Sequence, residues 1–146
     1  MLHMLRGIVG DETFFAGARA FLERRRYAMA RSDDLRLALE NASGRDLRPY
    51  FARWIEDTGL PRLRWSTSTH PLAGGSGFRT ALSVQVDDLP GPVPLLVTLA
   101  GEGGRTQRVQ LAPGGGSWTF ETPQKPRVSL NEDRGLLARV QRGGGP

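Results

Sequence analysis

The sequence contains no cysteine, and this absence excludes disulfide bonds and thiolate metal ligands. Lysine occurs once, at position 125, and histidine occurs only twice. No apolar run approaches the roughly 18 residues that a membrane-spanning helix requires. The opening letters "MLHMLRGIVG" are too short and wrongly flanked for a signal peptide. We therefore expect a soluble chain with no membrane partner, whose compartment the sequence does not specify.

The formal net charge is +5, and almost all of the basic residues are arginine. These arginines are scattered among acidic residues along the chain. Aromatic residues make up only 8% of the sequence, which leaves few side chains on which bases could stack. We therefore expect no nucleic-acid partner. The preference for arginine over lysine, together with many alanines, glycines and prolines, agrees with GC-rich coding.

Helical periodicity runs through residues 1–59, where we expect about four helices. The first has Leu2, Leu5 and Val9 at helical spacing, with Met1 inside the pattern and no capping residue before it. We therefore expect that this helix was cut from a longer chain. Asp11 is predicted to cap the second helix. The apolar face of that helix is predicted to be formed by Phe14, Ala18, Phe21 and Leu22.

The third helix is expected to open at Ser32, with two carboxylates in its first turn, and to stop at Gly44. A fourth is expected to open near Asp46, with Pro49 in its first turn, where proline is tolerated. Its predicted apolar residues are Leu47, Phe51 and Trp54. Gly59 and Pro61 then form a helix stop.

From residue 61 onward the apolar pattern has a period of two, which is typical of strands. Glycine-rich and proline-rich turns separate short strands at the spacing of a sandwich. The predicted strands are Leu63–Thr69, Phe78–Val86, Val93–Leu99, Arg105–Leu111, Ser117–Thr122, Arg127–Leu130 and Leu136–Val140.

The predicted fold class is therefore α+β in two segregated parts. A helical segment of about four helices is followed by an antiparallel, immunoglobulin-like β-sandwich of about seven strands. We expect a helical domain over residues 1–60, a sandwich over residues 61–142 and a flexible tail over residues 143–146.

The search for catalytic, cofactor-binding or metal-binding residues yields none. His3 and His70 are far apart and fit no metal-ligand spacing. Four adjacent acid pairs lie at helix starts or turns, where solvated caps explain them better than acid–base chemistry. They are Asp11–Glu12, Asp33–Asp34, Asp87–Asp88 and Glu132–Asp133.

Three further features also have structural explanations. Gly75–Thr80 leads into a strand, so no helix N-terminus is available to bind a phosphate there, and a hairpin turn is expected. Arg24–Arg26 is expected to be a solvated helix end, although such a cluster can bind an anion. Trp54 is expected to pack in the core against the sandwich, with an interface anchor as the alternative.

Four short motifs in residues 4–61 resemble one family in their order and spacing. They are "MLR" with "G-D-E-x-F" (Met4–Phe14), "S-D-D-L" (Ser32–Leu35), "S-G-R-D-L" (Ser43–Leu47) and "W-I-x-x-x-G-x-P" (Trp54–Pro61). Together they resemble the last part of the catalytic domain of the aminopeptidase N-type zinc metallopeptidases. The remainder, through "VPLLVTLAG" and "KPRVSLN", resembles the β-sandwich that follows that domain.

The resemblance implies a thermolysin-like catalytic domain of which residues 1–60 would form only the C-terminal helical part. In that family the zinc ligands, the general base and the substrate-amine motif lie upstream of the matching segment. No zinc or catalytic residue is therefore carried over. We expect a non-catalytic C-terminal scaffold fragment, inactive alone, with zinc bound only by a parent protein that retains its motif.

The partners that the resemblance implies are the missing N-terminal and catalytic parts of the same protein, and peptide substrates only through that parent. It also predicts that Leu2, Leu5 and neighbouring helices expose apolar surface, which could produce a homo-oligomer. The alternative is a stand-alone interaction or anion-binding adaptor module. That alternative requires the arginines to gather on one face. A complete small enzyme would require a nucleophile or metal constellation that the sequence lacks.

Overall fold

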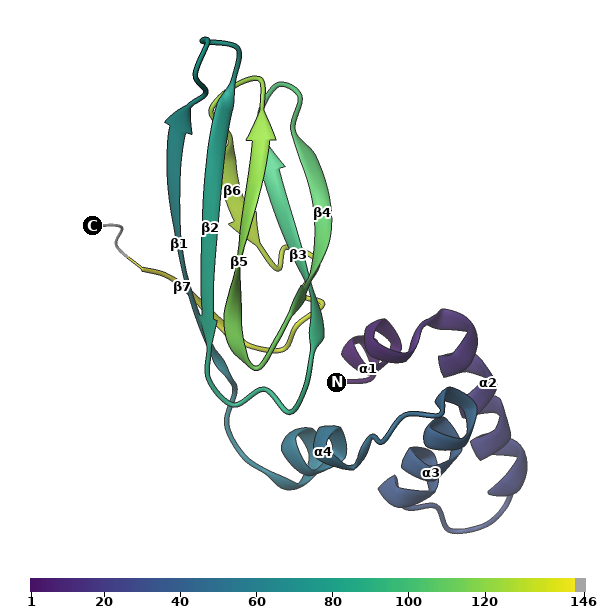
Figure 1. The fold of residues 1–146 in the computed structure, drawn as a ribbon. Helices are drawn as coiled ribbons and strands as arrows, with labels where there is room; N and C mark the ends of the chain where they lie inside the picture. The colour runs from purple at the N-terminus through teal and green to yellow at the C-terminus, as the bar shows by residue number, and fades with distance from the viewer. Residues whose placement is uncertain (144–146) are drawn as a thin grey trace. The chain divides into compact units, whose positions relative to one another are not determined.

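The computed structural model describes residues 1–143, and it divides into two compact units, Met1–Gly59 and Leu60–Pro146. Figure 1 shows the helices in the first unit and the strands in the second. The predicted fold class is confirmed, because four helices are followed by seven strands in two sheets. The predicted tail over residues 143–146 lies outside the described residues, apart from Gly143. No described helix is long and apolar enough to cross a membrane.

The helices follow the predicted segments closely. They are α1 (Leu2–Val9), α2 (Asp11–Arg24), α3 (Ser32–Ser43) and α4 (Arg48–Phe51), and α4 continues as a π-helical turn η1 (Ala52–Glu56). Gly44 ends α3 as predicted, with a left-handed φ of 65° that glycine adopts without a steric penalty.

Packing in the helical unit centres on α2 and α3. Leu39 of α3 is fully buried, and Gly17 is the buried residue of α2 that faces it. Phe14 and Phe21 flank Gly17 at helical spacing and are half-buried, as predicted. Leu22 is wrongly assigned to this face, because it is 65% exposed. Position 22 is five residues, or about 140°, around the helix from Gly17.

Two predictions near the chain start are also corrected. Leu2 is 47% exposed as predicted, but Leu5 is fully buried, so the expectation that Leu5 lies on exposed apolar surface is wrong. Asp11 does not cap α2. Gly10 occupies the N-cap position, and Asp11 is the first helical residue, whose carboxylate pairs with Arg6 at 2.6 Å.

The strands form a four-stranded sheet of order β5-β2-β1-β7 and a three-stranded sheet of order β4-β3-β6. Their bounds are β1 (Arg62–Pro71), β2 (Phe78–Val86), β3 (Val93–Ala100), β4 (Arg105–Leu111), β5 (Gly114–Thr122), β6 (Arg127–Leu130) and β7 (Arg139–Arg142). Alternate residues of β2 and β3 are buried, so each sheet turns one apolar face inward.

The seventh strand differs from its prediction in position and direction. It covers Arg139–Arg142 instead of residues 136–140, and it pairs in parallel with β1, whereas every other strand pair is antiparallel. Leu136 is buried in the loop before the strand, where its backbone N–H donates to the side chain of Asn131 at 2.8 Å. The apolar side chain of Leu136 thus fills the core from a loop.

Candidate functional site

The histidines, acidic pairs and arginines considered in the sequence analysis do not gather into one site among the described residues. Within residues 1–143 no group of three or more His, Cys, Asp or Glu residues is placed to hold a metal ion. His70 Nε2 lies 2.6 Å from Ser68 Oγ on the exposed face of β1. Arg25 pairs with Asp34, and Arg26 stacks over Tyr27 at 5.5 Å. The Gly75–Thr80 segment closes the hairpin between β1 and β2, as predicted.

The acid pairs are engaged in local contacts. Asp87 pairs with Arg64 at 3.3 Å, and Glu132 accepts a hydrogen bond from Ser129 at 2.7 Å. Asp133 pairs with Arg108 at 2.9 Å. These partners account for the acids as turn and surface residues.

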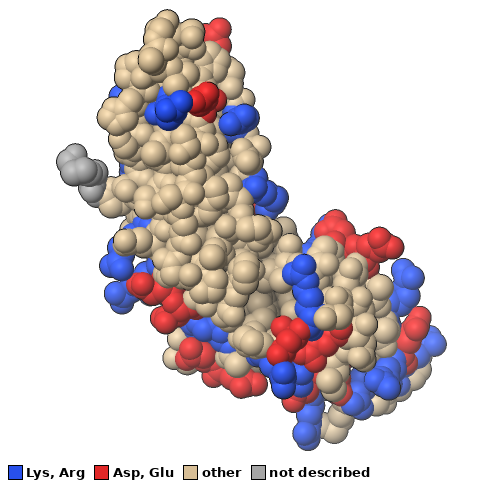
Figure 2. Space-filling view, viewed as in Figure 1, with Lys and Arg blue, Asp and Glu red and all other residues tan. Residues whose placement is uncertain are grey.

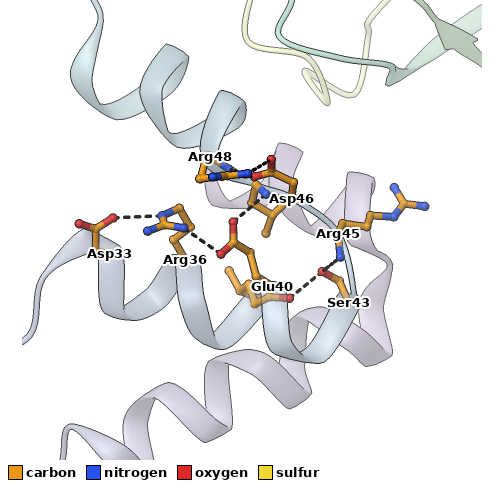
Figure 3. A network of polar contacts seen from close by, with 9 residues as sticks. Asp33, Arg36, Glu40, Ser43, Arg45, Asp46 and Arg48 are labelled. Carbon is orange, nitrogen blue, oxygen red and sulfur yellow. Dashed lines mark hydrogen bonds and ion pairs between the residues drawn. The ribbon is translucent and has the colours of Figure 1, made fainter.

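The densest polar arrangement is a network at the connection between α3 and α4 (Figure 3). Its centre is Glu40, whose carboxylate joins two elements. Oε2 accepts a hydrogen bond from Arg36 Nη1 at 2.8 Å, one helical turn earlier. Oε1 accepts the backbone N–H of Leu47 at 2.9 Å, just before α4. Arg36 also donates to Asp33 at 3.0 Å, so the network extends back to the first turn of α3.

The five residues of the "S-G-R-D-L" motif build this connection. Ser43 Oγ donates to the Leu39 carbonyl oxygen at 2.7 Å and accepts the Arg45 N–H at 3.3 Å. Gly44 supplies the left-handed turn. The side chain of Arg45 donates to the Ile8 carbonyl oxygen at 2.9 Å, which satisfies a carbonyl in the last turn of α1.

The last two motif residues, Asp46 and Leu47, lie directly before α4. The Asp46 carboxylate accepts the backbone N–H of Arg48 at 3.0 Å and two hydrogen bonds from its guanidinium at 2.9 and 2.7 Å. Hydrogen bonds from this side chain, then from the backbone N–H, lower the pKa of Asp46 to about 2. Leu47 is buried, and its N–H is bound by Glu40.

The "S-D-D-L" motif has a similar structural role at the other end of α3. The Asp34 carboxylate accepts the backbone N–H of Arg31 at 2.9 Å, half of a capping box. This hydrogen bond, followed by contacts with Arg25, lowers the pKa of Asp34. Asp33 pairs with Arg36. Both carboxylates therefore contact the start of α3, as their predicted place in its first turn suggests.

Sequence reasoning missed Glu40 and Tyr50. Glu40 lies four residues after Arg36, a spacing that predicts an ion pair on a helix surface and was available as a signal. Tyr50 is buried and donates a hydrogen bond from its hydroxyl to the Met1 carbonyl oxygen at 2.9 Å. Burial raises the pKa of Tyr50. Its link to the first residue spans the helical unit, and no local pattern indicates it.

Comparison with known proteins finds similarity to aminopeptidases over part of the chain. The chain is 41% identical to aminopeptidase N of Streptomyces lividans over 64 residues. The aligned stretch covers 44% of this chain and 8% of that protein. Aminopeptidase N of Lactococcus lactis subsp. lactis is 39% identical over 61 residues, covering 42% of this chain and 7% of that protein. No family model matches the sequence. Over these residues the chain is similar to a short segment of the aminopeptidases N.

Two further similarities extend over more of the chain. Leucyl aminopeptidase of Saccharolobus solfataricus is 29% identical over 102 residues, 70% of this chain and 13% of that protein. The crystal structure of Legionella pneumophila aminopeptidase A in complex with aspartic acid matches 99% of this chain and 17% of that chain, with a TM-score of 0.76 at 19% identity. The segment therefore spans a small part of each relative and shares the fold of the solved structure.

Proposed function

We propose that this chain is the non-catalytic scaffold of a zinc-dependent aminopeptidase-like protein, and that its parent removes N-terminal residues from peptides. Residues 1–60 would form the C-terminal helical part of the catalytic domain, and residues 61–142 the β-sandwich domain. The parent, if its motif is intact, would supply the zinc ligands and the catalytic groups. The remaining parts of that parent would be the partners of this chain.

One observation carries the proposal: the motifs shared with the family are engaged in holding helices together. Each residue of "S-G-R-D-L" binds a backbone group, forms the turn or fills the core. A residue whose polar atoms are occupied in this way supports a helix connection without contacting substrate. The similarity to aminopeptidases N over 61–64 residues supports the family part of the proposal.

A segment exchange tests the scaffold role. The matching segment of Streptomyces lividans aminopeptidase N is replaced by the corresponding residues of this chain, and hydrolysis of a chromogenic aminoacyl anilide and zinc content are measured. A scaffold is expected to leave zinc content unchanged and to retain hydrolysis. Arg19→Ala, at an exposed position of α2, serves as the neutral control, and Glu40→Ala is expected to lower the stability of the hybrid.

Two outcomes would contradict the proposal. A hybrid that folds and binds zinc but does not hydrolyse the anilide would mean that the segment supplies a group needed for catalysis. Stoichiometric zinc binding or hydrolysis by the isolated chain would place chemistry in the segment itself. Both assays are run on the full 146-residue chain and on the hybrid.

A further inference from the structure

The four-stranded sheet has an incompletely paired edge. The strand β1 has ten residues, but β7 pairs with it only over Arg62–Trp65. Within residues 1–143, the stretch Ser66–Pro71 has a strand neighbour on one side only, namely β2. An unpaired strand edge presents backbone donors and acceptors that another extended chain can bind.

The register identifies which backbone groups face this open side. The Arg62 carbonyl oxygen accepts the N–H of Asp87, so the even-numbered residues of β1 face β2. The Trp65 carbonyl oxygen accepts the N–H of Gly143, so the odd-numbered residues face the opposite side. The N–H and C=O groups of Thr67 and Thr69 therefore face the open edge.

A basic cleft lies beside the same edge. It has a volume of about 400 Å³, and it is lined by Thr67, Thr69, Lys125, Pro126, Arg127, Val128 and Arg142. Three of these side chains are cationic, and none is acidic. Lys125 and Arg142 form no ion pair with a described residue, and Arg142 instead stacks over Trp65 at 5.1 Å. Arg127 helps to lower the pKa of Glu132, after hydrogen bonds from Ser129 and Thr98.

We propose that the open edge of β1 and the basic cleft together bind an extended acidic peptide as an added strand. The peptide backbone would pair with Thr67 and Thr69, and alternate carboxylates would reach the cations of the cleft, because strand side chains alternate in direction. Charge complementarity selects an acidic occupant, since the lining carries only positive charge. This inference is independent of the proposed aminopeptidase parent.

The test is a titration of the full chain with fluorescein-labelled, terminally blocked peptides, followed by fluorescence anisotropy in 0.1 M NaCl. The peptide TETETETE is expected to bind saturably, and TKTKTKTK is expected not to bind. The double substitution Lys125→Ala with Arg127→Ala should weaken binding by about tenfold or more. Arg19→Ala with Arg105→Ala, both at exposed positions outside the cleft, removes the same number of charges and should leave affinity unchanged. In 1 M NaCl binding should fall strongly, because the Debye length shrinks from about 10 Å to about 3 Å.

A backbone substitution separates strand addition from simple charge attraction. Thr67→Pro removes the N–H that faces the open edge without removing a hydrogen bond to β2. The strand is therefore expected to tolerate this substitution, and peptide binding is expected to be lost. Thr67→Val keeps that N–H and should keep binding. If Thr67→Pro does not fold, the same question is answered by a TETETETE peptide N-methylated at alternate amides, which cannot pair along one edge.

Three results would overturn the proposal. The first is no binding of TETETETE up to millimolar concentration. The second is equal binding of the N-methylated peptide, or tighter binding of heparin or single-stranded DNA, which would indicate a general polyanion site. The third is dimerisation in light scattering that Thr67→Pro abolishes, which would make a second copy of the chain the occupant. A variant ending at Gly143 controls for residues 144–146.

Discussion

Gly17 of α2 packs against Ala38 and Leu39 of α3, and the substitution Gly17→Ala has two effects of opposite sign on stability. Alanine favours a helix interior over glycine by about 0.8–1.0 kcal/mol. However, a Cβ at this position would lie 2.8 Å from Leu39 Cδ2, 3.1 Å from Leu39 Cα and 3.2 Å from the Ala38 carbonyl oxygen. The first contact involves a side-chain tip that can move, but the other two involve backbone.

The steric effect is expected to win. Relief of the two backbone contacts requires α2 and α3 to separate, and overpacking of this kind costs about 1–3 kcal/mol. We therefore expect Gly17→Ala to lower the free energy of unfolding by about 1 kcal/mol, which corresponds to a fall of about 4–8 °C in Tm for a unit of this size. Gly17→Val, with a bulkier and β-branched side chain, should cost more.

Urea unfolding followed by circular dichroism at 222 nm measures this effect in the full chain. All of the described helices lie in residues 1–59, so the helical signal reports on that unit. Ala16→Gly, at an exposed position on the same helix, is the control, and it should cost about 1 kcal/mol through helix propensity alone. A Gly17→Ala variant that is more stable than the unsubstituted chain by about 1 kcal/mol would refute the close packing of α2 on α3.

Substitutions at Glu40, Tyr50 and Asp46 probe the connection between α3 and α4 and the start of the chain. Glu40→Ala leaves the buried Leu47 N–H without its acceptor and should lower the free energy of unfolding in urea by about 1–3 kcal/mol. Glu40→Gln keeps a carbonyl acceptor and should cost less. Equal costs for the two variants would mean that the hydrogen bond to Leu47 contributes nothing to stability. Burial raises the pKa of Tyr50 in the folded chain, so the unfolded chain loses the hydroxyl proton at a lower pH than the folded chain does. The free energy of unfolding that depends on this proton is therefore fully present below about pH 10 and is lost as the pH rises above it. Tyr50→Phe should flatten that loss between pH 10 and 12, and Tyr27→Phe, at a side chain that is 96% exposed, should not. Hydrogen bonds from Arg48 lower the pKa of Asp46 to about 2. The contribution of this carboxylate to the free energy of unfolding is therefore present above about pH 4 and is lost as the pH falls towards 2. Asp46→Asn should therefore show a smaller fall in urea midpoint over that range, and an unchanged acid profile would contradict the assignment.

Much of the fold follows from local patterns in the sequence. The strand β2 has the bounds that its alternation predicts, because it buries one side of a pleated strand along its length. The strand β4 also has its predicted bounds, although only Val109 and Leu111 are buried in it. The helix α3 begins at Ser32 and is followed by Gly44 at its C-cap, as predicted, because its start carries acidic residues and glycine permits the left-handed turn. These signals act within a few residues, so one sequence is sufficient to reveal them.

The elements that were predicted less well depend on distant parts of the chain. β7 is assigned by its parallel pairing with β1, about 75 residues away, and its four residues are all exposed, so no apolar alternation marks it. The buried residue of α2 is Gly17, which contributes no hydrophobic signal, whereas Leu22 of the predicted apolar face is exposed. Periodicity detects where side chains are apolar, whereas close helix packing can depend on the absence of a side chain.

The "S-G-R-D-L" motif also bears on how function is transferred between relatives. The motif is one of four that resemble the aminopeptidases, and in this structure its polar groups form hydrogen bonds at the ends of α1 and α3 and the start of α4. These contacts give the motif a structural role at a helix connection. A second chain with the same motif would therefore be expected to share this connection between helices.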